Sequence, residues 1–205
     1  MQSIPALLAK RDVIACAPTG SGKSGAFIIP ALIWAGFDLD PTVKRRGLIK
    51  TLLLTPTREL ATQIHREVTR LGTNKPGGLT AVLLSKNNAH LAATNCLGGD
   101  KGVDCLVTTP MRLCGVLNMQ DSKLNLGQVR LIALDEADRL LDKGDVADAA
   151  HEDEQTSASF VSQIDQILTA TPATTIRALF SATMGPNVRE LASTVSYVEG
   201  YMMIQ

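Results

Sequence analysis

A glycine-rich turn close to the start of the chain limits the possible folds more than any other feature. The segment Ala17-Pro18-Thr19-Gly20-Ser21-Gly22-Lys23-Ser24 separates residues 12–16, typical of a short buried strand, from an apolar helical run at residues 24–29. Such a turn points backbone N–H groups, and the positive end of the helix dipole, at a phosphate chain. The segment therefore predicts a binding site for a nucleoside triphosphate.

The residues of this turn agree with the phosphate-binding loop pattern except at Ala17, where glycine is usual. Gly20 and Gly22 let the backbone approach the phosphates, and Lys23 can reach the β- and γ-phosphates. The Ser24 hydroxyl can ligate Mg²⁺. The alternative is a chance Gly/Ser turn before a helix, and the strand–turn–helix context argues against it.

Apolar runs that favour strands alternate with helical patterns along almost the whole chain. Strands are expected at residues 13–16, 51–55, 80–84, 105–108, 131–134 and 176–180. Helices are expected at residues 23–34, 58–71, 111–117, 160–168 and 186–194. The alternation predicts an α/β fold, with a parallel sheet covered by helices on both faces. The charged stretches at 37–47 and 142–155 are expected to be solvated surface loops.

The composition supports one globular domain and excludes several functions. A chain of 205 residues with 45% hydrophobic content can bury a full core. Its 20 basic and 20 acidic residues cancel, so the net charge argues neither for nor against a nucleic-acid partner. The 3% aromatic content argues against base stacking as the main mode of any nucleic-acid contact. The four cysteines lack a C-x-x-C spacing, which argues against a zinc site. With no secretory signal or membrane-length apolar stretch, we expect an intracellular monomer without a membrane partner.

The unusual polar clusters follow the expected strands, at the end where ligands bind in parallel α/β sheets. They occur at residues 17–24, 56–61, 109–112, 135–138 and 181–183. Asp135 comes directly after an apolar strand, so its carboxylate can hold Mg²⁺ through water, opposite Ser24. Glu136 points differently and can orient or deprotonate an attacking water.

Five motifs in this order carry a family resemblance: the turn at 17–24, Pro-Thr-Arg-Glu-Leu-Ala at 56–61, Thr-Pro-x-Arg-Leu at 109–113, Asp-Glu-Ala-Asp at 135–138 and Ser-Ala-Thr at 181–183. The set resembles the first RecA-like domain of the DEAD-box ATP-dependent RNA helicases over nearly the whole chain. The resemblance implies a RecA-like P-loop domain that uses ATP and Mg²⁺ and contacts RNA. It also implies ATP hydrolysis coupled to local unwinding of an RNA duplex.

The resemblance assigns roles to individual residues. Lys23 and Ser24 would bind phosphates and metal, Asp135 would hold Mg²⁺, and Glu136 would activate water. Asp138, Ser181 and Thr183 would form a hydrogen-bonded link that couples the state of the nucleotide to RNA binding. The RNA sugar–phosphate backbone would be contacted, without sequence preference, by Pro56, Thr57, Arg58, Thr109, Pro110 and Arg112. Arginines and hydroxyls at a sheet edge independently suit phosphate contacts, which position a strand without reading its bases.

The chain also departs from the family pattern. Gln2 lies too close to Pro5 to be the glutamine that reads adenine, so the adenine reader is expected to be missing upstream. Leu83-Leu84-Ser85-Lys86 stands where the family has a Gly-Gly pair, and Met111 replaces a glycine. Leu-Ser-Lys at 84–86 and Thr-Thr-Pro-x-Arg-Leu at 108–113 are similar to the subfamily that acts on precursor RNA of the small ribosomal subunit, which implies a nucleolar location.

The second RecA-like domain of the family, with its arginine fingers, is expected to be missing after Gln205. An arginine finger is worth about 10³–10⁵ in rate, so residues 1–205 alone are expected to be nearly inactive. Three hypotheses follow: the ATP-binding half of an RNA helicase, a truncated module that binds nucleotide or RNA weakly, and an unrelated P-loop ATPase acting on DNA or protein. The motifs at 56–61, 109–113 and 135–138 argue against the third.

Overall fold

A computed structural model of the chain describes residues 2–18, 20–36, 48–73, 78–142, 160–195 and 202–204. The loop expected at 37–47 lies outside the described residues, as does nearly all of the loop expected at 142–155. Thr19, within the glycine-rich turn, is outside them as well.

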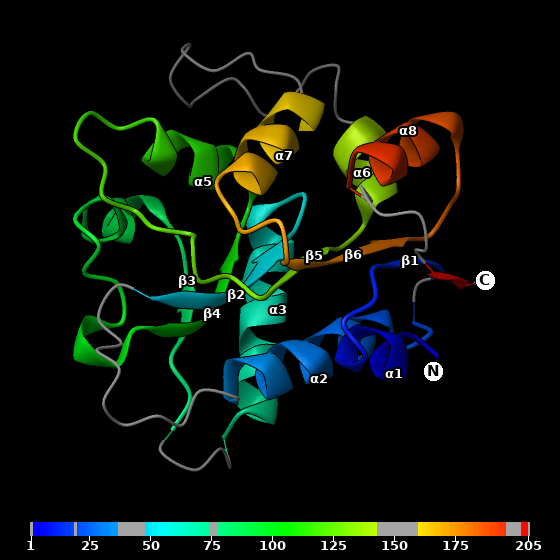
Figure 1. Cartoon of the computed structure of the whole chain (residues 1–205), viewed down its shortest axis with the longest axis horizontal. Helices are drawn as coiled ribbons and strands as arrows, with labels where there is room; N and C mark the ends of the chain where they lie inside the picture. Colours follow the sequence, from blue (N-terminus) through cyan, green and yellow to red (C-terminus); the bar gives the residue numbers. More distant parts are fainter. Residues whose placement is uncertain are drawn as a thin grey trace.

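The centre of the described structure is a parallel sheet of seven strands in the order β3-β4-β2-β5-β6-β1-β7 (Figure 1). The strands are β1 (Val13–Cys16), β2 (Ile49–Leu54), β3 (Ala81–Leu83), β4 (Val103–Thr108), β5 (Leu131–Leu134), β6 (Ile176–Ser181) and β7 (Met202–Ile204). The six expected strands are therefore confirmed, with ends that differ by at most two residues. The seventh, three-residue β7, was not predicted from the sequence.

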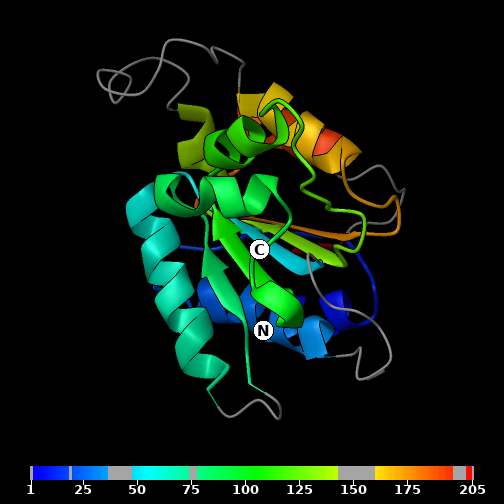
Figure 2. The same cartoon turned by 90° about the vertical axis from the view of Figure 1, so that its left-hand side faces the viewer.

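Helices cover both faces of this sheet, as Figures 1 and 2 show. One face carries α1 (Ser3–Leu8), α2 (Lys23–Gly36) and α3 (Arg58–Leu71). The other carries α4 (Ala89–Ala93), α5 (Pro110–Leu117), α6 (Ala137–Asp142), α7 (Phe160–Thr169) and α8 (Pro186–Val195). None of the helices in the described ranges is both long and apolar enough to cross a bilayer. The expected α/β fold with helices on both faces is thus confirmed.

Each face of the sheet has its own apolar core. Phe27 and Phe180 pack with their ring centroids 5.1 Å apart on the α1–α3 face. Leu106, Leu113 and Ile132 belong to the core on the other face. Every residue of the central strands β2, β4 and β5 is buried, as expected for a parallel sheet with both faces covered.

The five expected helices are confirmed, and α1, α4 and α6 were missed. These three have only five or six residues, so they show little of the 3.6-residue periodicity that identifies a longer helix. Two helices begin at clear sequence signals. Thr57 caps α3 by accepting a hydrogen bond from Leu60 N, and Thr109 caps α5, which starts with Pro110.

Candidate nucleotide and RNA site

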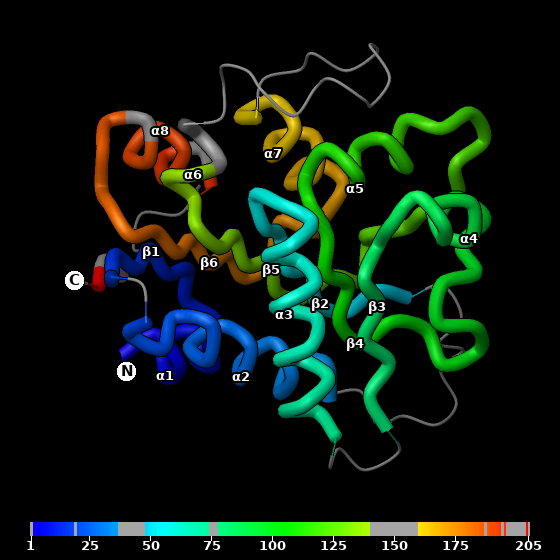
Figure 3. The backbone as a smooth tube through the Cα atoms, turned by 180° about the vertical axis from the view of Figure 1, so that it is seen from behind, coloured from blue at the N-terminus to red at the C-terminus, as the bar shows by residue number. Residues whose placement is uncertain are grey.

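The strand order brings three of the predicted polar clusters to neighbouring strands. β6 lies between β1 and β5, and the three strands run parallel (Figure 3). Cys16, the last residue of β1, pairs with Ser181, and Leu134, the last residue of β5, pairs with Leu179. The carboxyl ends of these parallel strands form one edge of the sheet, called the carboxyl edge below. At this edge lie the turn after β1, Asp135 after β5 and Ser181 at the end of β6.

The glycine-rich turn takes a conformation that depends on its glycines. Gly20 and Gly22 have φ angles of 81° and 86°, in the left-handed region that favours glycine. A Cβ added at either would meet no atom within 4 Å, so the backbone is open to an approaching group. The turn is fixed to the sheet by Ala17 N, which donates to Ser181 O at 3.0 Å. Together these features form an open backbone turn at the start of α2.

Lys23 begins α2 next to this turn. Its Nζ is shielded from solvent, yet it has no hydrogen-bond partner among the described residues. The positive charge of Lys23 favours the ionised form of Asp135 and so lowers the pKa of that carboxyl. A buried ammonium group without a partner is costly and uncommon, which fits a group that binds phosphate. Ser24 follows Lys23 as the second residue of α2.

Asp135 is 7% exposed, and its backbone N donates to Leu54 O at 2.9 Å. Burial raises the pKa of its carboxyl to about 6, and repulsion from Glu136 and Asp138 adds to the rise. The hydrogen bond from Glu136 N and the charge of Lys23 act in the opposite direction. Mg²⁺ is usually held by one or two protein carboxylates together with phosphate and water oxygens, and the buried carboxyl of Asp135 fits that role. In the part of the chain that the structure describes, no three acidic, histidine or cysteine side chains converge on a metal site.

Glu136 has φ 51°, an uncommon angle for a residue with a side chain. Its backbone N donates to Asp135 Oδ1 at 3.0 Å. Its Oε2 lies 3.1 Å from Arg139 Nη1. Backbone strain of this kind is concentrated at functional sites. Arg139 was not singled out in the sequence, although Glu and Arg three residues apart across a helix start suggest such a pair.

Asp138 joins the start of α6 to the loop after β6. Its Oδ2 accepts hydrogen bonds from both the backbone N and the hydroxyl of Thr183, each at 3.1 Å. Burial alone would raise the pKa of Asp138, but these bonds and others outweigh it and lower the pKa. Ser181 contributes to this lowering, although its geometry falls short of a hydrogen bond. The predicted residues Asp138, Ser181 and Thr183 therefore lie together.

The other two predicted clusters, at residues 56–61 and 109–112, follow the neighbouring strands β2 and β4. Leu54 pairs with Thr108, so the starts of α3 and α5 are adjacent at the same edge. The hydroxyl of Thr57 accepts from Leu60 N at 3.2 Å, and that of Thr109 accepts from Arg112 N at 3.4 Å. Both hydroxyl oxygens thus cap helices, and their O–H groups can still donate.

The other residues predicted to contact RNA differ in exposure. Arg58 is exposed, whereas Pro56 and Arg112 are half-buried and Pro110 is buried. Met111, which stands in place of glycine, is 53% exposed. Cations at the start of a helix are mildly unfavourable, so the exposed Arg58 at the first position of α3 suits a bound anion.

The segment that replaces the Gly-Gly pair forms a short 3-10 turn, η1 (Lys86–Asn88), after β3. Asn88 Oδ1 accepts from Ser85 N at 2.7 Å, and Asn88 Nδ2 donates to Leu83 O at 2.9 Å. These bonds fix the loop without glycine. The departure therefore changes which side chains lie at this edge while the loop stays tied to β3.

Comparisons with known proteins agree with the fold and identify the family. The chain is 38% identical over 197 residues to "ATP-dependent RNA helicase ROK1" of Yarrowia lipolytica, a match that covers 95% of this chain and 32% of the relative. It is 38% identical to "Probable ATP-dependent RNA helicase ddx52" of Dictyostelium discoideum, covering 95% of this chain and 25% of the relative. The chain thus spans about a third or less of these relatives.

The fold is also found in solved structures. A DEAD box protein from the hyperthermophile Methanococcus jannaschii superposes with a TM-score of 0.73 at 30% identity, covering 100% of this chain and 48% of that one. The family model for DEAD/DEAH box helicases matches residues 1–191. By this match over most of its length, and by motifs that meet at one edge of a RecA-like sheet, the chain belongs to the DEAD/DEAH box helicase family.

Proposed function

We propose that this chain is the ATP-binding half of an ATP-dependent RNA helicase, which couples ATP hydrolysis to RNA binding and local duplex unwinding. One observation carries the proposal: the buried, unpartnered Nζ of Lys23 and the buried carboxyl of Asp135 lie at the same sheet edge where α3 and α5 begin. A nucleotide site and an RNA surface on one edge can respond to each other.

The nucleotide would be held by the turn at residues 17–24. Lys23 would bind the β- and γ-phosphates, and Ser24 and Asp135 would hold Mg²⁺. Bound Mg²⁺ would neutralise charge on the phosphates. The unpartnered Lys23 Nζ and the raised pKa of Asp135 support this assignment. When nucleotide and Mg²⁺ are bound, Lys23 would be paired with phosphate and Asp135 with the metal ion.

Glu136 would act as the general base that takes a proton from the attacking water. Asp138, Ser181 and Thr183 would form the link between nucleotide and RNA. The two hydrogen bonds from Thr183 to Asp138 support such a link, since they join the segment after β5 to the segment after β6.

RNA would be held through its sugar–phosphate backbone by Pro56, Thr57, Arg58, Thr109, Pro110 and Arg112. The exposed guanidinium of Arg58 and the N-termini of α3 and α5 suit phosphate groups. Neutralising one phosphate contributes about one to the slope of log K against log salt. Arg58→Ala should therefore lower that slope by about one in RNA binding, equally for RNAs of different sequence.

The subfamily likeness extends the proposal to ribosome biogenesis, on precursor RNA of the small subunit in the nucleolus. Relatives named ROK1 and ddx52 support this assignment. RNA crosslinked to the protein in cells tests it, with enrichment of that precursor as the expected result.

The catalytic assignment is tested in a two-domain form, in which residues 1–205 are followed by a second RecA-like domain. We expect RNA-stimulated ATPase activity that Lys23→Ala and Glu136→Gln both abolish. Loss of the general base alone should cost about 10²–10⁴ in turnover. Wild-type turnover in Glu136→Gln would refute the assignment.

A second candidate is a module that binds nucleotide or RNA weakly and turns nothing over. The share of the relatives that the chain spans, 32% or less for the two relatives above, favours this for residues 1–205 taken alone. We expect these residues to bind nucleotide and to separate no duplex. Unwinding by this chain alone would contradict the need for two domains.

A further inference from the structure

Glu136 and Arg139 form an ion pair that the proposed catalytic roles leave unexplained. Arg139 Nη1 lies 3.1 Å from Glu136 Oε2. The Glu136 side chain is 15% exposed, whereas that of Arg139 is 61% exposed. The pair therefore joins a largely buried acid at the site to a guanidinium at the surface.

Glu136 lies outside the helices and strands, so regular backbone hydrogen bonding does not fix the direction of its side chain. It lies between the end of β5 and the start of α6, with φ 51°. Its Oε2 is shielded from solvent and receives no hydrogen bond from the described residues. A glutamate side chain has several rotatable bonds and loses entropy when it is held in one orientation. The charge of Arg139 is the attraction that favours one orientation.

We propose that Arg139 is a positioning residue that holds the Glu136 carboxylate in the orientation needed to accept a proton from the attacking water. The inference rests on the proposed function, because it takes Glu136 as the general base. A carboxylate has two oxygens and about four lone-pair sites. A guanidinium beside Oε2 can therefore restrain the group and leave lone pairs to accept the proton.

A second ion pair in the chain provides a control that distinguishes a positioning role of Arg139 from ordinary stabilisation by a surface ion pair. Arg70 and Glu67 have the same three-residue spacing, with 2.7 Å between Nη2 and Oε2, and both are exposed. They lie in the last turns of α3, and twelve residues of helix separate Arg70 from Arg58 at the site edge, about 18 Å. Exposed pairs contribute little to stability, so Arg70→Ala is a matched control.

The test compares Arg139→Ala, Arg139→Lys and Arg70→Ala in the two-domain form. Arg139→Ala should lower kcat about tenfold and leave KM for ATP unchanged, because a misplaced base loses part of the roughly 10²–10⁴-fold it supplies. Arg139→Lys keeps the positive charge and should restore most of kcat. Arg70→Ala should match the wild type, and the urea midpoint of all three variants should be unchanged.

Several outcomes would overturn the positioning role. Wild-type kcat in Arg139→Ala, beside an inactive Glu136→Gln, would overturn it and leave the proposed function intact. A raised KM for ATP at constant kcat would show that Arg139 binds nucleotide instead. A lowered urea midpoint that explains the lost activity, or no rescue by Arg139→Lys, would also overturn it. Wild-type turnover in Glu136→Gln would reject the proposed function itself.

Discussion

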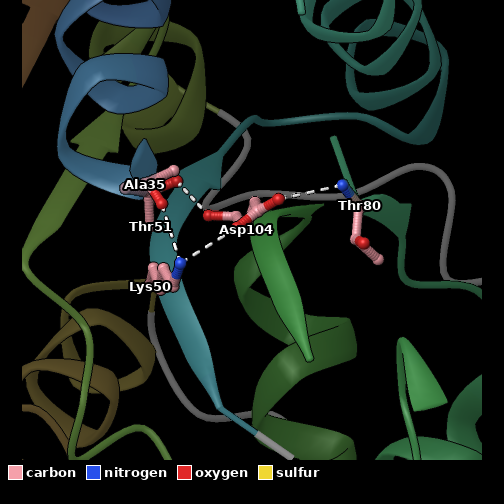
Figure 4. Close-up of polar contacts among 5 residues, drawn as sticks. All are labelled: Ala35, Lys50, Thr51, Thr80 and Asp104. Carbon is pink, nitrogen blue, oxygen red and sulfur yellow. Dashed lines mark hydrogen bonds and ion pairs between the residues drawn. The ribbon is translucent and has the colours of Figure 1, made fainter. Parts of the chain in front are cut away.

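At the amino edge of the sheet, where the parallel strands begin, Lys50 and Asp104 are buried and paired with each other (Figure 4). At the carboxyl edge, by contrast, the buried Nζ of Lys23 has no hydrogen-bond partner among the described residues. Lys50 Nζ donates to Asp104 Oδ1 at 3.2 Å and to Ala35 O at 2.8 Å. Asp104 Oδ2 accepts from Thr80 N at 3.0 Å. The network ties the end of α2, the starts of β2 and β4, and the residue before β3.

The carboxyl edge leaves several of its buried polar atoms without hydrogen bonds among the described residues. Asp138 Oδ1 and Ser181 Oγ also lack hydrogen-bond partners among the described residues, and Glu136 holds a strained backbone angle. Unmade hydrogen bonds and strain both lower stability. One sheet therefore uses similar charges for two purposes: satisfied groups at the amino edge fix the fold, and unsatisfied groups at the carboxyl edge fit ligand binding.

The largest expected effect is at the amino edge. Asp104→Ala removes the counter-charge of Lys50 and the acceptor of Thr80 N in a site where Lys50 is 5% exposed. Breaking a buried ion pair on one side costs about 3–5 kcal/mol, because the remaining charge stays buried. We expect the free energy of unfolding, measured in urea, to fall by about that amount.

The control is the double substitution Lys50→Met and Asp104→Leu, which removes both charges and keeps apolar volume. Replacing a buried pair in this way is often neutral or stabilising, so the double variant should be more stable than Asp104→Ala. A loss of under about 1 kcal/mol in Asp104→Ala would show that water reaches Lys50, and would weaken the contrast between the edges.

Local patterns were enough to predict the fold and the edge at which the polar clusters meet. Residues 13–16 and 131–134 are apolar, and a polar cluster directly follows each, so strand, turn and ligand edge are all local in sequence. Parallel pairing then sends their carboxyl ends to one edge. The roles of the site residues remain predictions, since they depend on the ligands.

Features that depend on distant contacts could not be predicted. Lys50 and Asp104 are 54 residues apart, and each looks like an ordinary polar residue at a strand start. The strain at Glu136 depends on how β5 meets α6, which its residue type does not reveal. The three-residue β7 is recognised only by its pairing with β1.

The second prediction concerns the raised pKa of Asp135. A carboxyl with pKa about 6 in the folded protein, against 3.8 unfolded, holds its proton more tightly when folded. Its contribution to stability is therefore present below about pH 4, decreases as the pH rises towards 6, and stays lost at pH 7. Each pKa unit corresponds to about 1.4 kcal/mol, so the penalty at pH 7 is up to about 3 kcal/mol.

Asp135→Asn removes this penalty and keeps an oxygen that can accept from Glu136 N. Without nucleotide, we expect the variant to be more stable than the wild type at pH 7, by about 1–3 kcal/mol, and equally stable near pH 4. Urea unfolding at both pH values measures this. A variant that is less stable at pH 7 would contradict the view that the carboxyl edge lowers stability.

The smallest expected effect on stability is at Thr57, which caps α3 and is also proposed to contact RNA. Thr57→Ala removes the cap that accepts from Leu60 N, and loss of a threonine cap costs about 1 kcal/mol. Thr62→Ala on the same helix is the control, because the exposed Thr62 hydroxyl donates to Arg58 O within the helix, and alanine favours helices there. We expect Thr57→Ala alone to lower the urea midpoint. Equal urea midpoints in the two variants would mean that the Thr57 cap contributes nothing to stability. The proposed RNA contact alone would then account for a threonine at this position of the carboxyl edge.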